Sequence, residues 1–162
     1  MARAVVADAG PLIAFGRIGR LDLLPRVLGE VLVTEGVLAE CIVQPLRPGA
    51  LAIQGALAEG TLVRAPDPDS SHPPFPVLGA GESTAIRLAL KLSVPVLMDE
   101  RSGRKIAGNL GVTVIGSGGV LLAAKKLGLV DLVAPLLESF RTNGYHLSHA
   151  LVQAILTRAQ ER

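Results

Sequence analysis

Short apolar runs alternate along this chain with longer segments whose apolar residues recur at helical spacing. Strands separated by helical segments pair in parallel, because the crossover helix returns the chain to the end of the sheet where the previous strand began. The runs that read as strands are 4–7, 30–33, 61–64, 95–98 and 112–115. The pattern therefore predicts an α/β fold in which crossover helices connect the strands of a parallel sheet.

Helical segments are predicted between and after these strands. Those between strands, and the one after the last, are 11–15, 21–28, 34–41, 48–58, 81–92, 101–110 and 118–127. Two further helices close the chain, one from about Asp131 to Phe140 and one capped by Ser148. The segment 65–78 is predicted to be a loop, because its prolines exclude a helix or a central strand. No boundary is evident, so 1–162 is predicted to be one domain, with 131–162 as a helical extension packed on it.

The composition excludes several classes of protein. Sixteen Lys and Arg against fourteen Asp and Glu leave a net charge of +2, so nucleic acid would have to bind to a local patch. A single cysteine excludes a disulfide scaffold and fits a reducing cytoplasm. Glycines divide the longest charge-free run, between Lys105 and Lys125, into pieces too short to span a membrane. Asp8 argues against a signal peptide, so we expect a cytoplasmic protein with no membrane partner.

Acidic residues fall at positions where a parallel sheet forms its binding crevice. Asp8 and Asp99 each follow a predicted strand directly, and the carboxyl ends of such strands line the crevice. Glu82 lies in the first turn of a predicted helix on its inward face, and Glu40 leans toward an apolar face of another. Three of the acids also have an ordinary explanation: Asp8 as a brace of the turn before Pro11, Asp99 as a helix cap, and Glu82 as a first-turn charge that complements the helix dipole.

Four acids from separate elements together favour a metal site. Clustered carboxylates raise one another's pKa unless a divalent ion lies among them, and hard oxygen ligands select Mg²⁺ or Mn²⁺. Such an ion can activate a water and stabilise charge on a phosphoryl oxygen. The acids therefore suit the hydrolysis of a phosphodiester.

Four segments carry a resemblance to a known family: VVADAGPLIAF (5–15), VLAE (37–40), LGAGESTAIRLAL (78–90) and VLMDERSGRKIAGNLGVTVIGSGGVLLAAKKLGL (96–129). With the terminal helices, they make the chain resemble the PIN-domain family over nearly its whole length. The similarity is to a prokaryotic, predicted nucleic-acid-binding branch related to toxin–antitoxin ribonucleases.

The resemblance implies a three-layer α/β/α sandwich with a central parallel sheet of about four to five strands and a C-terminal helical hairpin. It implies a metal-dependent endoribonuclease that cuts single-stranded RNA with Mg²⁺ or Mn²⁺, without a protein nucleophile. By position, Asp8, Glu40, Glu82 and Asp99 match the catalytic, metal-binding acids, with Glu100 as a further candidate ligand. The implied cellular role is the toxin of a toxin–antitoxin pair, and the implied partners are RNA, an antitoxin protein and a second copy of the chain.

Two departures from the family's pattern keep other functions open. Many members place Ser or Thr where this chain has Gly10, and many place Thr-x-Asp where it has Asp99-Glu100-Arg101. These departures motivate a non-catalytic module that binds nucleic acid or protein. A third class, phosphotransfer with Asp8 as the nucleophile, is disfavoured because no Asp-x-Asp follows the first strand.

Basic residues follow the second aspartate. Arg101, Arg104 and Lys105 lie about one turn apart on a predicted helix, so they are candidates to hold RNA phosphates. They could instead pair with the acids or simply be solvated. Cys41 is interpreted as a small buried apolar residue, since no histidine lies near it in the sequence.

Overall fold

A single parallel sheet forms the centre of the computed structural model, which describes residues 3–69 and 74–162. Its strands are β1 (Ala4–Ala7), β2 (Glu30–Thr34), β3 (Val63–Ala65), β4 (Val96–Leu97) and β5 (Val114–Ile115). They are arranged in the order β3-β2-β1-β4-β5, and every neighbouring pair is parallel. The chain first builds outward from β1 to β3 and then crosses to the other side of β1, so the switch point lies between β1 and β4. Ligands of such sheets bind beyond the carboxyl ends of the strands at this point.

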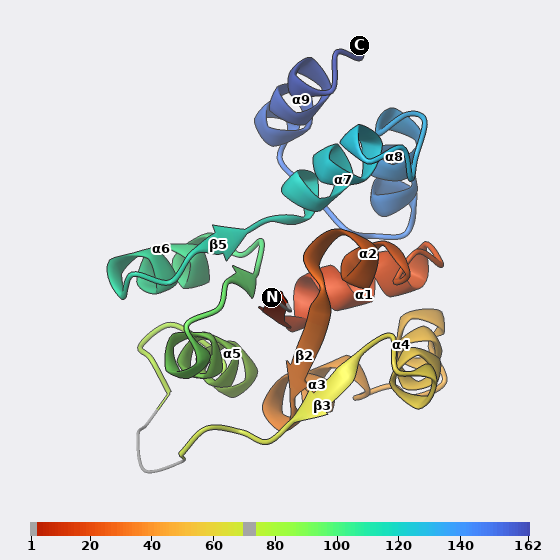
Figure 1. Cartoon of the computed structure of the whole chain (residues 1–162). Helices are drawn as coiled ribbons and strands as arrows, with labels where there is room; N and C mark the ends of the chain where they lie inside the picture. The colour runs from red at the N-terminus through yellow and green to blue at the C-terminus, as the bar shows by residue number, and fades with distance from the viewer. Residues whose placement is uncertain (1–2, 70–73) are drawn as a thin grey trace.

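Helices cover both faces of the sheet, as the family resemblance implies. In Figure 1, α5 and α6 lie to the left of the sheet, while α1, α2 and α4 lie to its right. The short α3 contacts both α1 and α5. The bounds are α1 (Ala9–Arg17), α2 (Leu23–Leu28), α3 (Glu35–Cys41), α4 (Pro48–Glu59), α5 (Ala80–Leu92), α6 (Arg101–Asn109), α7 (Ser117–Lys126), α8 (Ala134–Thr142) and α9 (His149–Arg158). The architecture is a three-layer α/β/α sandwich of the PIN-like kind.

Local chemistry explains where several helices begin and end. Thr34 precedes α3 in an extended conformation, and its Oγ1 accepts a hydrogen bond from the Val37 N–H at 3.1 Å. Ser148 caps α9 in the same way. Helix α4 begins at Pro48 and ends at Gly60, whose φ of 82° lies in the left-handed region that favours glycine. These are the signals by which the sequence predicts these ends.

Some expectations need correction at the level of single elements. The run 112–115 was expected to be a buried strand, but β5 is an edge strand and both of its residues are half-buried. The strand expected at 61–64 lies at Val63–Ala65 instead. Helix α1 starts at Ala9 and not at Pro11. Pro11 is tolerated inside the helix because it still lies in the first turn, where an N–H group has no partner within the helix.

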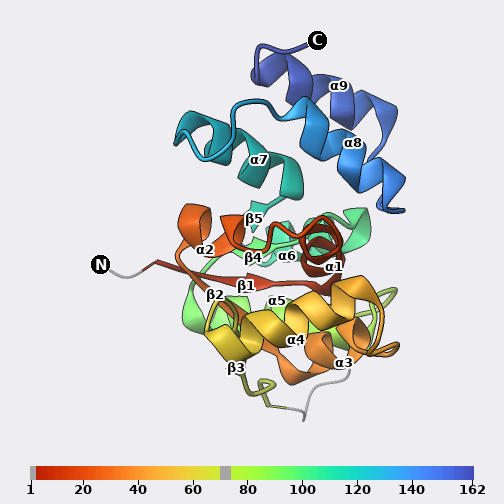
Figure 2. The ribbon, with the colours of Figure 1, turned by 90° about the vertical axis from the view of Figure 1, so that its right-hand side faces the viewer.

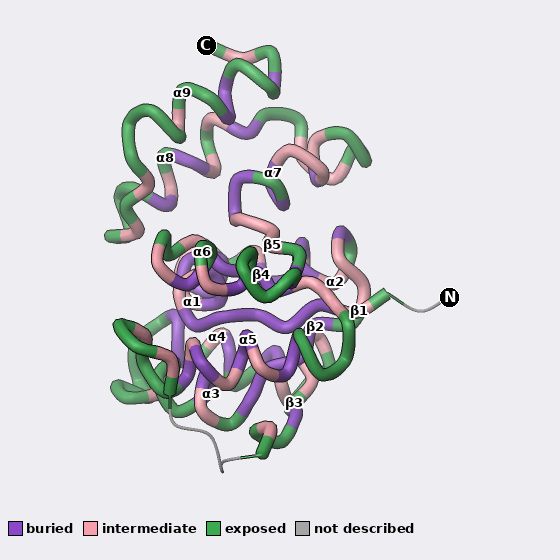
Figure 3. Tube along the Cα trace, turned by 90° about the vertical axis from the view of Figure 1, so that its left-hand side faces the viewer, coloured by how far each residue is buried: buried purple, intermediate pink, exposed green. Residues whose placement is uncertain are grey.

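The extension formed by α8 and α9 packs on the rest of the molecule. Figure 2 shows α7, α8 and α9 grouped above α1 and α2, and α7 contacts α2 while α8 contacts α1. Phe140 of α8 is fully buried and meets Phe15 of α1 edge to face, with ring centroids 5.2 Å apart. Buried apolar residues form one continuous cluster from β1 to α9 (Figure 3). The extension therefore shares the core of the sandwich.

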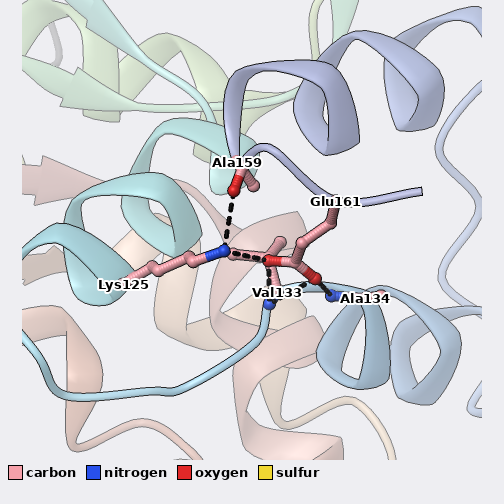
Figure 4. A network of polar contacts seen from close by, with 5 residues as sticks. All are labelled: Lys125, Val133, Ala134, Ala159 and Glu161. Carbon is pink, nitrogen blue, oxygen red and sulfur yellow. Dashed lines mark hydrogen bonds and ion pairs between the residues drawn. The ribbon is translucent and has the colours of Figure 1, made fainter.

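The chain end is fixed by a polar network (Figure 4). The Glu161 carboxylate accepts hydrogen bonds from the N–H groups of Val133 and Ala134 at 2.8 and 2.9 Å, at the start of α8. Lys125 of α7 donates to that carboxylate at 2.9 Å and to the Ala159 carbonyl at 2.7 Å. This network ties α7, α8 and α9 together.

Within the described ranges, no helix is long and apolar enough to cross a membrane.

Candidate metal centre

The candidate acids gather around one cavity at the carboxyl ends of β1 and β4. This cavity has a volume of about 750 Å³, and it lies at the switch point of the sheet. The candidate residues that line it are Asp8, Glu40, Glu82, Asp99, Glu100, Arg101 and Arg104. Lys105 is exposed on α6 and is not among the lining residues.

Asp8 is the buried acid of the cavity. It occupies the N-cap position of α1, but its side chain makes no capping hydrogen bond. The residue is 5% exposed, and its Oδ1 atom is buried with no hydrogen-bond partner. Burial raises the pKa of Asp8 to about 7; the Ala9 N–H acts to lower it, and the negative charges of Glu82, Glu40 and Asp99 act to raise it. Such a carboxylate lacks the compensation that a cation would provide.

Asp99 is held by donors from the C-terminal part of the chain. Its Oδ1 accepts a hydrogen bond from the Ser117 N–H at 2.7 Å, at the start of α7. Its Oδ2 accepts one from Ser117 Oγ at 2.5 Å and a short one from the Tyr145 hydroxyl. Gly116 allows this approach, because a Cβ there would lie 3.2 Å from Asp99 Oδ1 and 2.6 Å from Arg104 Nη1.

Glu100, and not Asp99, caps α6. Its carboxylate accepts hydrogen bonds from the N–H groups of Ser102 at 3.0 Å and Gly103 at 2.7 Å. Partial burial acts to raise the pKa of Glu100, but these donors outweigh it and the pKa is lowered. Of the two neighbouring acids, Asp99 reaches into the site between α6 and α7, while Glu100 stabilises a helix end.

Glu40 and Glu82 come from α3 and α5, which approach each other closely. Glu40 Oε1 accepts a hydrogen bond from the Gly81 N–H at 3.0 Å, and a Cβ on Gly81 would collide with that oxygen. The expectation that Glu40 leans toward an apolar face is wrong, because the residue is exposed at the cavity. Glu82 is half-buried, and burial followed by the charges of Glu100 and Glu40 raises its pKa.

The carboxylate oxygens in this cavity fit a hydrated Mg²⁺ or Mn²⁺ ion. In residues 3–69 and 74–162, no three Asp, Glu, His or Cys side chains converge into a closed ligand group. Mg²⁺ does not need one, since it keeps several waters and takes one or two carboxylates from the protein. The unpartnered Oδ1 of Asp8 is an oxygen that such an ion would satisfy. Asp8, Glu82, Glu40 and Asp99 are the residues that would hold it, directly or through water.

Sequence reasoning missed two residues that the structure brings to this site. Ser117 is not among the candidates that the sequence offers, yet it supplies two of the three donors to Asp99. Tyr145 lies 46 residues beyond Asp99 and follows no motif, so no local signal marks it. Only the packing of α8 brings its hydroxyl to the cavity.

The fold and the acids define an α/β protein with an acidic crevice of the nuclease type. A family model described as a PIN domain (DUF3368) matches residues 4–161, so the chain belongs to the PIN-domain family. PIN domains are generally nucleases, and the family typically uses divalent metals.

One solved structure and the curated proteins complete the comparison. A PilT N-terminus domain protein from the hyperthermophilic archaeon Sulfolobus solfataricus P2 is 16% identical, with a TM-score of 0.45 over 90% of this chain and 98% of that one. No curated protein matches the sequence.

Proposed function

We propose that this protein is a divalent-metal-dependent endoribonuclease that hydrolyses single-stranded RNA. The observation that carries the proposal is the buried, unpartnered Oδ1 atom of Asp8 in an open cavity lined by four further candidate acids. A folded chain tolerates such a group when a cation compensates it. Membership of the PIN-domain family supports the same chemistry.

The roles of the residues follow from their positions. A Mg²⁺ or Mn²⁺ ion bound there would supply an activated water and would stabilise negative charge on a phosphoryl oxygen. Asp8 and Glu82 offer carboxylates with raised pKa values, which an ion would return to their charged forms. Arg101 and Arg104 line the cavity and are exposed, so they can contact phosphates of the substrate.

Cys41, the single cysteine of the sequence, is not an activated nucleophile. Burial, followed by the charges of Asp8 and Glu40, raises the pKa of Cys41 to about 12, so it remains a thiol. This supports attack by water. The toxin role, the antitoxin partner and the homodimer stay predictions that rest on the family resemblance.

The decisive experiment compares wild type with an Asp8→Asn/Asp99→Asn double variant. Mn²⁺ is titrated into each protein by calorimetry, and each is then incubated with a mixed pool of single-stranded RNA. Asp22→Asn is the matched control, because Asp22 is a half-buried residue that pairs with Arg20 and Arg26 and does not line the cavity. We expect wild type and the control to bind and cut, and the double variant to do neither.

The other outcomes separate the alternatives. Binding of Mn²⁺ by wild type without any cleavage would favour the non-catalytic module suggested by Gly10 and the Asp99-Glu100 pair. Absence of both binding and cleavage would overturn the metal-dependent ribonuclease. A stable phosphoryl group on Asp8 would instead indicate phosphotransfer.

A further inference from the structure

The hydrogen bonds of Asp99 leave its carboxylate with little freedom. A carboxylate has about four lone-pair positions on its two oxygens. Ser117 N–H fills one on Oδ1, and Ser117 Oγ and the Tyr145 hydroxyl fill both on Oδ2. The remaining position belongs to Oδ1, so the two side-chain hydroxyls decide which oxygen stays available.

Tyr145 is itself held in place by aromatic packing. Its ring meets Phe140 edge to face at a centroid distance of 5.7 Å, and Phe140 meets Phe15 of α1 in the same way. Its N–H also donates to the Phe140 carbonyl at 2.8 Å. Tyr145 lies in the segment between α8 and α9, and these contacts tie it to Phe140 of α8 and through Phe140 to the core.

Gly10 leaves the space that the hydroxyl needs. A Cβ at residue 10 would lie 3.2 Å from Tyr145 Oη, in the first turn of α1. A larger side chain at this position would push the phenol away from Asp99. Gly10 stands where the family usually has Ser or Thr, and the nearby hydroxyl of Tyr145 explains why a small residue is needed there.

We propose that Tyr145 is a positioning residue for Asp99 in the metal site, and that the C-terminal extension is thereby a working part of that site. This inference rests on the proposed metal-dependent function. Hydrogen bonds to a ligating carboxylate set its orientation, and their loss typically weakens metal binding by about 10–100-fold. Tyr145 acts on the ion through Asp99 and does not touch the substrate.

The first test is Tyr145→Phe, which keeps the ring and its contact with Phe140 and removes only the hydroxyl. Thr142→Val is the matched control, since it removes one hydroxyl from the last residue of α8, three residues before Tyr145, where Thr142 donates to the Ser139 carbonyl. Free Mn²⁺ is measured by electron paramagnetic resonance, and folding is checked by thermal denaturation. We expect Tyr145→Phe to bind Mn²⁺ about 10-fold more weakly, while Thr142→Val binds as wild type does.

A second readout uses wild-type protein. Tyr145 is the only tyrosine and the chain has no tryptophan, so intrinsic fluorescence in the aromatic region reports this side chain. A hydrogen bond to a carboxylate quenches tyrosine emission, so Asp99→Asn should fluoresce more strongly than wild type. Mg²⁺ should leave the emission of wild type low, because the positioning contact persists when the ion binds.

The outcomes distinguish this inference from the proposed function. Equal or tighter Mn²⁺ binding by Tyr145→Phe, or a strong rise in wild-type emission with Mg²⁺, overturns the positioning role, because the hydroxyl would then be idle or would compete with the ion. Wild-type protein that binds Mn²⁺ with the expected loss in Tyr145→Phe, but cuts no RNA, overturns only the ribonuclease. Failure of wild type to bind Mn²⁺ overturns both.

Discussion

Two aspartates at equivalent places in the sheet have opposite surroundings. Asp8 follows β1 and has a buried oxygen with no partner, whereas Asp99 follows β4 and accepts three hydrogen bonds. Burial of an oxygen without a partner makes the charged form of Asp8 costly, whereas three donors hold the Asp99 carboxylate in one orientation. Asp8 is therefore the acid whose charged form a bound cation would stabilise, and Asp99 is the acid whose carboxylate is already oriented.

The raised pKa of Asp8 predicts how the stability of the metal-free protein depends on pH. A folded-state pKa of about 7 against an ordinary value of 3.8 means that the folded protein binds this proton more tightly than the unfolded chain. Stability is therefore full below about pH 4 as far as this group is concerned, and it is lost as the pH rises through 7. Glu82, whose pKa is also raised, acts in the same direction.

Asp8→Asn should remove most of this loss. With a chelator present, the variant should exceed wild type at pH 8 by at most about 4 kcal/mol, and by much less at pH 5. Urea unfolding at the two pH values measures the difference. The same gap at both pH values would show that ionisation of Asp8 is not its cause.

At the scale of elements, glycines let α3 and α5 approach closely enough to place Glu40 and Glu82 at one cavity. A Cβ on Gly36 would lie 3.0 Å from Thr84 Oγ1, and one on Gly81 would lie 3.0 Å from the Gly36 carbonyl as well as against Glu40. The hydroxyls of Thr34 and Thr84 meet at 2.8 Å across the same contact. The position of Glu40 thus depends on the packing of two helices.

Gly81→Ala should therefore destabilise the fold by about 1–3 kcal/mol, since overpacking forces backbone and side chains apart. It should also weaken Mn²⁺ binding, because Glu40 loses its place. Gly55→Ala is the control: Gly55 lies in α4 with nothing within 4 Å of an added Cβ, so it should stabilise the protein by roughly 0.5–1 kcal/mol. Urea unfolding and Mn²⁺ titration of both variants check this, and equal effects of the two substitutions would contradict it.

The network at Glu161 predicts a second effect at this scale. The side chain is 7% exposed, and its loss would leave the N–H groups of Val133 and Ala134 without their acceptor and remove one of the two acceptors of the Lys125 ammonium. Glu161→Ala should cost about 1–3 kcal/mol in urea unfolding. Glu138→Ala removes an ion pair with Arg141 that is open to solvent, so its effect should be clearly smaller. Equal losses in both variants would mean that the network adds nothing beyond an ordinary surface pair.

At the scale of the whole molecule, the sequence predicts the parallel sheet and the gathering of acids. It does not predict that Ser117 and Tyr145 contact Asp99. Strand ends and helix first turns are local properties, so Asp8, Asp99 and Glu82 could be placed from periodicity and caps. The exposure of Glu40 and the arrival of Tyr145 depend on how α3, α5 and α8 pack, which no short pattern encodes. For the same reason β5 was expected to be buried, since only the sheet order makes it an edge strand.

Under the proposed function, the small net charge of +2 requires a local patch to attract RNA, and Arg101 and Arg104 line the cavity. Binding through these two and Lys105 should release counterions, so the logarithm of the affinity should fall with the logarithm of salt at a slope of about −2 for a single strand. Replacing Arg101 and Arg104 by Gln should reduce this slope to about −0.7. Fluorescence anisotropy of a labelled RNA between about 50 and 200 mM salt, in an Asp8→Asn background that prevents cleavage, measures both. An unchanged slope would place the RNA on another basic surface, and the acidic cavity would then act on a strand held elsewhere.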